Sequence, residues 1–461
     1  MPKAHIVGLG RSGVAAAKLL HHHGWTVELS DRNHSAALQV LAQSLQAAGI
    51  TVQLGQSWEL PATGGPEALV VSPGVPWDLP VLMAARKRGI DTLGEMELAW
   101  RYLQTPPWVA ITGTNGKTTT TALTAAIFQA AGYHAPACGN IGYAACELAL
   151  QQATTATAYD WIIAEVSSYQ IESSRDLAPK IGLWTTFTPD HLQRHYSLEN
   201  YYQIKASLLQ RSQQQLLNGD DPYLRRLGRE AWPEACWTSV QGKGALLGPP
   251  ERGVYIEAGQ IVAFGEAIAP VASLRMLGAH NQQNLLLAVG AACLAGVEPE
   301  SIARAIAAFP GVPHRLEWVC TYDGIEFIND SKATNYDAAQ VGLASVPPGA
   351  ILIAGGEAKA GDNREWLATI GERAAAVVLF GAAAPAFAQA LEQAGYSPWE
   401  IVPTLAEAVS RSLALAQGTG ARTVLLSPAC ASFDQYRDFE ERGEHFRQLC
   451  YQLATKEQAL G

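Results

Sequence analysis

The segment Trp108-Val109-Ala110-Ile111-Thr112-Gly113-Thr114-Asn115-Gly116-Lys117-Thr118-Thr119 decides the fold of this chain. Its first four residues predict a buried strand, and the run from Thr118 to Ala131 predicts a helix after a glycine loop. A strand, a glycine loop with lysine and hydroxyl, and a helix N-terminus together hold nucleotide phosphates. Because Ile111 stands where the general P-loop pattern has its first glycine, the loop is the shorter Gly-x-x-Gly-Lys-Thr. This departure predicts a particular group of ATP-using proteins.

Each residue type in the loop suits one part of a bound triphosphate. Glycines let backbone N–H groups approach phosphate oxygens, Lys117 can reach the terminal phosphates, and the Thr118 hydroxyl can ligate Mg²⁺. A turn without a ligand would not need a lysine followed by threonines. We therefore predict that ATP is bound by Gly113, Thr114, Asn115, Gly116, Lys117, Thr118 and Thr119.

Composition excludes several classes of protein. The 461 residues suggest three domains of ~150 residues, and 48% hydrophobic residues with 16% charged ones are typical of folded cores. The net charge of −10 disfavours a nucleic-acid partner. No apolar run reaches about 18 residues, so no membrane span is expected. The seven cysteines are scattered singly, and the N-terminus lacks a secretory pattern, so we expect reduced thiols and a cytoplasmic location.

Strands and helices alternate along the whole chain, which predicts an α/β protein. We expect a Rossmann-like N-terminal domain over residues 1–100 and a central P-loop-type ATPase domain with a mainly parallel sheet over 101–311. A C-terminal Rossmann-like domain would cover 312–461. Apolar alternation on both sides of Ala258-Gly259 predicts a β-hairpin at the end of the central domain.

A second glycine turn lies near the N-terminus. Gly8-Leu9-Gly10-Arg11-Ser12-Gly13 matches the dinucleotide fingerprint between a strand and a helix, and Asp31 ends the next predicted strand. Taken alone, this pattern predicts an NAD-dependent dehydrogenase. The same turn can also bind another diphosphate or no ligand at all, so these alternatives stay open.

Three residues of the central region are candidate metal ligands or bases. Glu165 ends an apolar run, where a carboxylate is costly unless it is paired or bound to metal, and it could join Thr118 on Mg²⁺. His191, after Thr188-Pro189-Asp190, could ligate a second metal, although a structural histidine is the simpler interpretation. Lys205, taken alone, is predicted to be a solvated helix lysine.

Further polar segments follow predicted strands or open helices. Asn281 and Asn284 open an apolar helix, where either could be a cap. Arg315 follows a proline-rich hinge and could reach a phosphate. The loops Ile328–Asn335 and Leu426–Tyr436 carry so many donors and acceptors that a binding site is favoured over a plain turn.

In this order, the motifs resemble those of the Mur ligases of peptidoglycan synthesis, over residues 5 to 448. The matching segments are TGTNGKTT, GNIG, EVSSYQ, PDH, HN..N, PHR, NDSKATN and SPACASFDQY. The last, with Asp438 to Gly443 after it, is most similar to the members that add D-glutamate. The alternatives are a ligase for another amino acid, a folylpolyglutamate-type synthetase, and a non-catalytic sensor of cell-wall precursors.

The resemblance implies an ATP-dependent ligase that adds D-glutamate to UDP-N-acetylmuramoyl-L-alanine through an acyl phosphate, with ATP and Mg²⁺ at two sites. We expect a monomer. The resemblance gives Lys117, His191 and Lys205 catalytic roles, with Thr118 and Glu165 on one metal and His191 and a carbamylated Lys205 on the other. The nucleotide would also contact Asn281, Asn284, Arg315 and Asp330. The UDP-substrate would contact Arg11, Ser12, Asp31, Arg32, Ser72, Pro73, Gly74 and Asn140. D-Glutamate would contact Lys332, Thr334, Lys359, Ser432 and Phe433.

The chain departs from the family pattern before Lys359. The family often has Gly-Gly-x-Gly-Lys there, whereas this chain has Gly355-Gly356-Glu357-Ala358-Lys359. Contacts from Glu357 and Ala358 therefore do not carry over.

Overall fold

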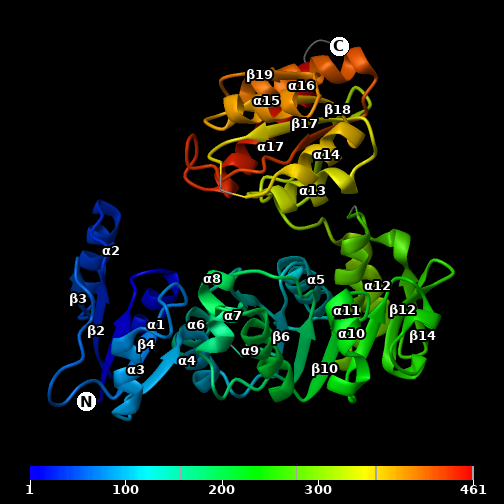
Figure 1. The fold of residues 1–461 in the computed structure, drawn as a ribbon. Helices are drawn as coiled ribbons and strands as arrows, with labels where there is room; N and C mark the ends of the chain where they lie inside the picture. Colours follow the sequence, from blue (N-terminus) through cyan, green and yellow to red (C-terminus); the bar gives the residue numbers. More distant parts are fainter. Residues whose placement is uncertain (156–157, 277, 359–360, 459–461) are drawn as a thin grey trace. The chain divides into compact units, whose positions relative to one another are not determined.

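The computed structural model describes residues 1–155, 158–276, 278–358 and 361–458. It divides into two compact units (Figure 1). The first combines Met1–Ser273 with Gln282–Ala308, and the second combines Leu274–Asn281 with the chain from Phe309 onward.

The first unit begins with a five-stranded parallel sheet in the order β3-β2-β1-β4-β5. The strand order reverses between β1 and β4, and in open α/β sheets such a reversal leaves a ligand crevice at the carboxyl ends of the strands. The elements are β1 (Lys3–Val7), α1 (Arg11–His22), β2 (Thr26–Asp31), α2 (Ala36–Ala47), β3 (Thr51–Leu54), β4 (Ala68–Val71), α3 (Pro80–Lys87), β5 (Asp91–Gly94) and α4 (Glu95–Tyr102).

The same unit contains a nine-stranded sheet in the order β14-β13-β12-β11-β10-β9-β6-β8-β7. Its strands are β6 (Trp108–Thr112), β7 (Ala137–Gly139), β8 (Ile162–Glu165), β9 (Ile181–Trp184), β10 (Gln214–Asn218), β11 (Cys236–Ser239), β12 (Gly253–Glu257), β13 (Gln260–Ala263) and β14 (Glu266–Pro270). The hairpin predicted around Ala258-Gly259 is confirmed, since β12 and β13 pair antiparallel with Glu257 opposite Gln260.

Helices and short 3-10 turns connect these strands. They are α5 (Lys117–Ala130), α6 (Ala145–Thr155), α7 (Ser168–Glu172), α8 (Leu192–His195), α9 (Leu198–Arg211), α10 (Pro222–Ala231), α11 (Ala279–Leu294) and α12 (Pro299–Ala308), with η1 (Lys243–Ala245), η2 (Pro250–Arg252) and η3 (Val271–Ser273). The strands that carry the predicted site, β6, β8 and β9, are neighbours and parallel. Their carboxyl ends therefore meet at one edge of the sheet.

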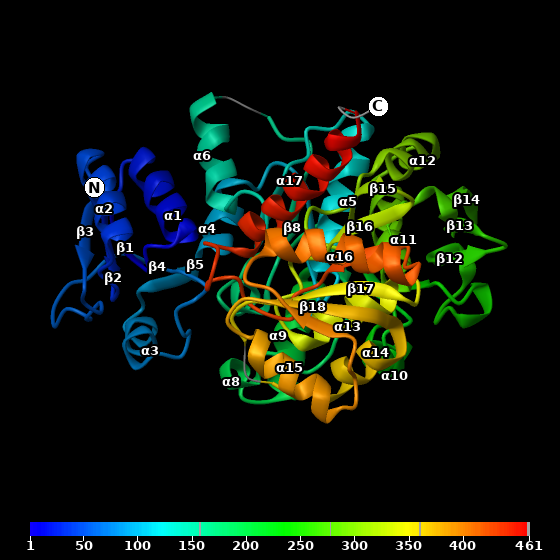
Figure 2. The same ribbon diagram turned by 90° about the horizontal axis from the view of Figure 1, so that it is seen from above.

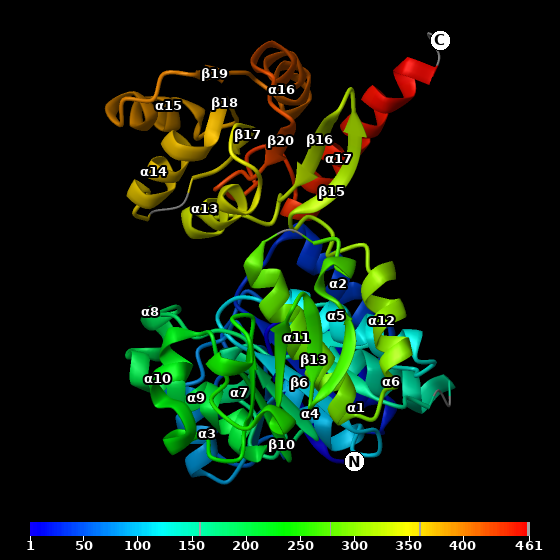
Figure 3. The ribbon, with the colours of Figure 1, turned by 90° about the vertical axis from the view of Figure 1, so that its right-hand side faces the viewer.

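The second unit holds a six-stranded sheet in the order β15-β16-β20-β17-β18-β19. β15 runs antiparallel to β16 and lies beside the last helix (Figure 3), while the other pairs are parallel. The elements are β15 (Glu317–Tyr322), β16 (Ile325–Asn329), α13 (Tyr336–Ser345), β17 (Ala350–Gly355), α14 (Arg364–Arg373), β18 (Ala374–Phe380), α15 (Ala384–Gln393), β19 (Trp399–Ile401), α16 (Leu405–Thr419), β20 (Thr423–Leu426) and α17 (Phe439–Gln458).

Both faces of this sheet are covered by helices (Figure 2). Apolar side chains of α13, α14 and α15 form one core with one face of the strands, and those of α16 and α17 form a second core with the other. Such double coverage explains the nearly continuous apolar run of β17, which is buried over its whole length.

The predicted α/β fold is confirmed, because the three sheets and their helices alternate as expected. The boundaries predicted at residues 100 and 311 stay predictions. Within the part of the chain that the structure describes, no helix combines the length and the apolar character needed to cross a membrane.

Helix α4 joins the two sheets of the first unit through two buried glutamates. The Glu97 carboxylate accepts the backbone N–H groups of Asp176 and Leu177 at 3.0 and 3.1 Å. The Glu95 Oε1 accepts the Cys146 N–H at 2.6 Å, whereas its Oε2 is buried and has no hydrogen-bond partner among the described residues. Burial raises the pKa of Glu95 from 4.5 to about 7.

The raised pKa of Glu95 predicts a pH-dependent stability. Because the folded pKa exceeds the unfolded one, the neutral acid stabilises the fold at low pH, and this contribution is lost as pH rises through about 7. Glu95→Gln stays neutral throughout, so its unfolding free energy relative to the parent should rise by about 3 kcal/mol between pH 4 and pH 8. Urea titrations across this range measure the difference, with the exposed Glu67→Gln as the control. A difference that does not change with pH would contradict the prediction.

Candidate active site

The phosphate loop lies between β6 and α5, and two of its glycines are required by its shape. Gly116 has a φ of 82°, a left-handed conformation in which side chains other than glycine are strained. A Cβ on Gly113 would collide with the Thr185 hydroxyl, and one on Gly116 would collide with the Asn284 side chain. Since α5 begins at Lys117, the free N–H groups of its first turn follow directly on the loop.

Two lysines meet at one carbonyl oxygen of this loop. The Lys117 Nζ donates to Gly113 O at 3.0 Å and to Thr114 O at 2.8 Å. The Lys205 Nζ, from α9, donates to the same Gly113 O at 2.8 Å and to the Thr112 hydroxyl at 3.3 Å. The structure therefore brings both predicted catalytic lysines to the end of β6.

Lys205 corrects the prediction made from its own segment. It is not a solvated helix lysine, because its side chain is buried, with 1% of its surface exposed. Its Nζ also lies 4.8 Å from the centre of the Tyr201 ring, and it makes no ion pair within the described residues. Burial, and then the charge of Lys117, hold the pKa of Lys205 well below its ordinary value.

Glu165 stands at the carboxyl end of β8 and is also buried, with 1% of its surface exposed. Its Oε2 accepts the Thr118 hydroxyl at 2.9 Å, and its Oε1 accepts the Asn140 amide at 2.8 Å. The carboxylate thus joins the start of α5 to the loop after β7. Glu165 and Thr118 therefore lie within hydrogen-bond distance of each other, and their role as joint Mg²⁺ ligands stays a prediction.

The donor set around Glu165 fits Mg²⁺. Carboxylate and hydroxyl oxygens are the ligands that Mg²⁺ prefers, and it is commonly bound by one or two carboxylates together with substrate phosphates. Among the described residues, no group of three or more histidine, cysteine, aspartate or glutamate side chains is arranged to hold a metal. Thr118 and Glu165 therefore offer a partial coordination shell next to a phosphate loop.

His191 comes directly before α8, on a short strained segment. It has a φ of 53°, in the left-handed region, and 42% of its side chain is exposed. Its ring faces Tyr169 of α7 at 5.1 Å between centroids, and its Nε2 lies 3.4 Å from Asp190. The imidazole is packed against Tyr169 on one side and is otherwise partly exposed, so a ligand can reach it.

Most of the residues predicted for the UDP-substrate line one cavity of about 800 Å³. It lies at the carboxyl ends of β1, β2 and β4, and it contains Arg11, Ser12, Asp31, Arg32, Ser72, Pro73 and Gly74. Both oxygens of Asp31 already accept backbone N–H groups, from Leu9 and Asn33 at 2.8 Å, so this carboxylate closes the glycine turn.

Asn140 lies outside this cavity but is connected to it. The Arg11 guanidinium donates to Gly139 O at 3.4 Å, and the Asn140 backbone N–H donates to Glu165 O at 3.0 Å. A chain of contacts therefore runs from the cavity to the Glu165 carboxylate within the first unit.

The remaining nucleotide residues divide between the units. Asn284 contacts the first turn of α5, since its Oδ1 accepts the Thr120 hydroxyl at 3.3 Å. Asn281, Arg315 and Asp330 belong to the second unit. The Asp330 carboxylate accepts the Ser427 hydroxyl at 2.8 Å, and burial raises its pKa to about 7.

The residues predicted for D-glutamate lie on two loops of the second unit. Lys332 and Thr334 follow β16, and Ser432 and Phe433 follow β20, its parallel neighbour. The Lys332 Nζ lies 3.7 Å from the centre of the Phe439 ring. Ser432 is buried, whereas Phe433 is 68% exposed. Lys359 lies outside the described residues.

Arg442, which was not among the predicted site residues, connects these loops to one another. Its guanidinium is fully buried and donates to oxygens from three strand-end loops: Ser331 Oγ and O at 3.0 and 2.8 Å, Cys430 O at 3.0 Å, Ala431 O at 3.3 Å and Gly355 O at 3.5 Å. Burial lowers its pKa to about 10. In the sequence, the segment from Asp438 to Gly443 contributed only to the family resemblance. The one local signal for a buried arginine was its position close to the apolar Phe439.

The arrangement of three α/β sheets, a phosphate loop and a buried carboxylate defines a class of ATP-dependent ligases. Family models match in three consecutive blocks: "Mur ligase MurD-like, N-terminal domain" over residues 2–94, "Mur ligase middle domain" over 111–292, and "Mur ligase, glutamate ligase domain" over 314–430. The chain belongs to the Mur ligase family.

Two relatives are similar to this chain over its whole matched length. The chain is 66% identical to a protein of Microcystis aeruginosa and 63% identical to one of Rippkaea orientalis. Each alignment covers 98% of this chain and 100% of the relative. Both relatives are named UDP-N-acetylmuramoylalanine–D-glutamate ligase.

Solved structures share the fold at low identity. A UDP-N-acetylmuramate-alanine ligase of Thermotoga maritima is 17% identical, with a TM-score of 0.58, over 98% of this chain and 100% of that one. A pseudomurein peptide ligase of Methanothermus fervidus is 18% identical with the same TM-score and coverage. The family models and the relatives at 66% and 63% identity, and not these structures, set the dehydrogenase alternative aside in favour of the ligase family.

The position of Arg442 predicts a specific loss of stability. Arg442→Met fills a similar volume but leaves several buried oxygens without a donor, so it should destabilise the second unit by about 2–4 kcal/mol. Arg442→Lys keeps the positive charge but loses the planar set of guanidinium donors, so its loss of unfolding free energy should be smaller than that of Arg442→Met. Chemical unfolding measures both, with the exposed Arg437→Met as the control. Equal stability of Arg442→Met and the parent would contradict the assignment.

Proposed function

We propose that this chain joins D-glutamate to UDP-N-acetylmuramoyl-L-alanine at the expense of ATP, in the synthesis of peptidoglycan precursors. Its membership of the Mur ligase family and its identity to relatives of that name over their whole length support the substrates. The observation that carries the chemistry is the Glu165 carboxylate, held between Thr118 of the phosphate helix and Asn140 beside the UDP-substrate cavity. The cytoplasmic location and the monomeric state stay predictions.

The reaction must make an amide from a carboxylate, whose hydroxide is a poor leaving group. Transfer of the γ-phosphoryl group of ATP to the carboxylate of the muramoyl-alanine gives an acyl phosphate. The amine of D-glutamate then attacks the carbonyl carbon, and the tetrahedral intermediate expels phosphate to give the amide. Lys117 would spread the negative charge that develops during the phosphoryl transfer.

The chain's own residues would position the reactants. Glycines and N–H groups of the Gly113–Thr119 loop bind the phosphates, and Asn284 and Thr120 hold that loop in place. Thr118 and Glu165 would hold one Mg²⁺, which neutralises phosphate charge when bound. Asn140 would orient the acceptor substrate. The nucleotide would also contact Asn281, Arg315 and Asp330, and D-glutamate would contact Lys332, Thr334, Lys359, Ser432 and Phe433.

Lys205 is proposed to be carbamylated, and its surroundings support this. A carbamate forms when a neutral amine attacks CO₂ and releases a proton, so the low pKa of Lys205 favours the reaction. The product places an anion next to the Lys117 ammonium, which donates to the same Gly113 O and attracts the new charge. With His191, the carbamate oxygens would hold the second Mg²⁺.

Phosphate release across amino acids tests the proposed reaction. With UDP-N-acetylmuramoyl-L-alanine, ATP and Mg²⁺, release should require D-glutamate and should stay near background with L-alanine or diaminopimelate. Lys117→Ala should lower kcat by at least about 10³-fold, because a charge-stabilising contact is lost, while binding of the UDP-sugar is retained. Release with L-alanine but not D-glutamate would overturn the proposal.

Chemical rescue tests the carbamylation. Lys205→Ala should be inactive, and short carboxylic acids such as acetate or formate should restore part of the activity by supplying the missing oxygen ligands. Lys18→Ala, an exposed lysine of α1, is the control that should need no rescue. Full activity of Lys205→Ala without added acid would refute this role.

A further inference from the structure

A second cavity, of about 590 Å³, lies in the first unit on the face of α9 that does not carry Lys205. Its α9 lining comes from five residues, whose helical spacing places them on one face: Asn200, Gln203, Ile204, Ser207 and Arg211. The opposite face carries Lys205 toward the phosphate loop. This cavity is therefore separate from the site described above, but it shares a helix with it.

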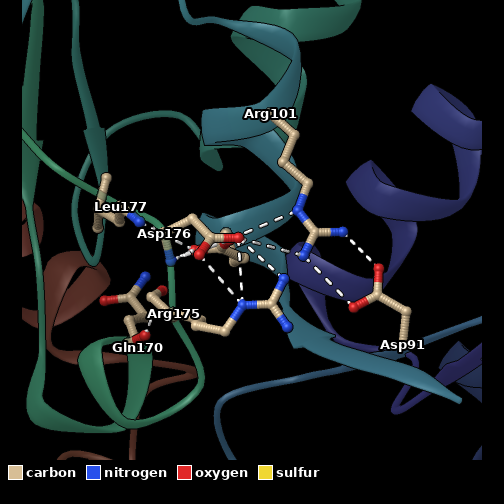
Figure 4. Close-up of polar contacts among 8 residues, drawn as sticks. Asp91, Arg101, Gln170, Arg175, Asp176 and Leu177 are labelled. Atoms are coloured by element: carbon tan, nitrogen blue, oxygen red, sulfur yellow. Dashed lines mark hydrogen bonds and ion pairs between the residues drawn. The ribbon is translucent and has the colours of Figure 1, made fainter. Parts of the chain in front are cut away.

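Four arginines and two glutamates line this cavity, and most of their charges are already paired. Arg101 pairs with Asp91 at 2.5 Å, and Arg175 pairs with Asp176 at 2.9 Å (Figure 4). Of the two glutamates, Glu172 pairs with Arg194 at 2.8 Å, and Glu97 accepts backbone N–H groups and lies 3.5 Å from Arg101. Within the described residues, the other two arginines, Arg86 and Arg211, make no ion pair.

The guanidinium groups of Arg86 and Arg211 are each only partly satisfied. The Arg86 Nη2 donates to Trp77 O at 3.0 Å, and the Arg211 Nε donates to Leu177 O at 3.0 Å. The Arg86 Nη1 and the Arg211 Nη2 are buried and have no hydrogen-bond partner among the described residues. Burial lowers the pKa of both groups. A buried donor without an acceptor is costly, and more so when it is charged.

We propose that this cavity binds a small organic phosphate, whose oxygens accept hydrogen bonds from Arg86 and Arg211. A phosphate monoester carries close to two negative charges and three acceptor oxygens, which match two guanidinium groups in charge and geometry. The volume lies in the range of ligand pockets and exceeds the need of an inorganic ion. Trp77, Leu93 and Ile204 supply apolar wall for the carbon skeleton.

The ligand would bridge two parts of the first unit. Arg86 belongs to α3, beside the N-terminal sheet, and Arg211 is the last residue of α9, beside the middle sheet. An anion held by both arginines restrains α9 from the face opposite Lys205. The binding itself does not depend on the proposed ligase activity, so either can fail without the other.

Calorimetric titration of the full-length chain with glucose 6-phosphate tests the proposal. Arg86→Gln and Arg211→Gln should each weaken binding by at least about tenfold, because each removes one charged hydrogen-bonding partner. Arg88→Gln, an exposed arginine next to α3 that does not line the cavity, should bind like the parent. Glucose without the phosphate should not bind. Equal affinities in the parent and both cavity variants would overturn the proposal.

Crystals of the full-length chain soaked with tungstate, a phosphate-like oxyanion with anomalous scattering, locate the site directly. An anomalous peak within hydrogen-bond distance of Arg86 and Arg211 is expected, and a peak at the Lys117 loop serves as the internal control. A peak at the loop with none in the cavity would overturn the proposal. If either glutamine variant folds poorly, Arg211→Lys can replace it. This variant keeps the positive charge but loses the planar pair of guanidinium donors, so it should also bind the anion less tightly.

Discussion

The Glu165 carboxylate is the interaction on which the arrangement of the first unit depends. A buried carboxylate is stable only when its oxygens are bound, and here one oxygen binds the Thr118 hydroxyl and the other the Asn140 amide. These partners come from the phosphate helix and from the loop after β7, which Arg11 also contacts through Gly139 O. One side chain therefore connects the start of the phosphate helix to the loop that borders the cavity at the N-terminal sheet.

Local signals in the sequence were enough for the fold and for part of the site. Apolar runs ended by glycine or polar residues identified β6, β8 and the β12–β13 hairpin, because strand ends and turns depend on residues adjacent in the chain. The link between Glu165 and Thr118 followed from parallel strands, whose carboxyl ends share an edge. The roles assigned from the family resemblance stay predictions, since positions of side chains do not by themselves establish function.

Burial of single charged residues could not be predicted, because it is set by segments distant in sequence. Lys205 has the surroundings of a surface helix residue, and it is buried only because α9 packs across the end of β6. Arg442 stands among acidic residues at the start of α17, yet its guanidinium is enclosed by loops from β16, β17 and β20. In both cases the partners include backbone oxygens, which every sequence contains and which no motif reveals.

The two cationic sites of the first unit differ in how their charge is balanced. At Gly113 O, two amines share one acceptor, and a phosphate or a carbamate would remove the excess positive charge. In the second cavity, the aspartates and glutamates are already bound to Arg101, Arg175, Arg194 and backbone N–H groups. Among the described residues no carboxylate lies within ion-pair distance of Arg86 or Arg211, although Glu172 and Asp78 act on the first and Glu97 and Asp176 on the second from further away. In a chain with a net charge of −10, two half-buried arginines that each keep a buried nitrogen without a hydrogen-bond partner are a place where an anion can bind.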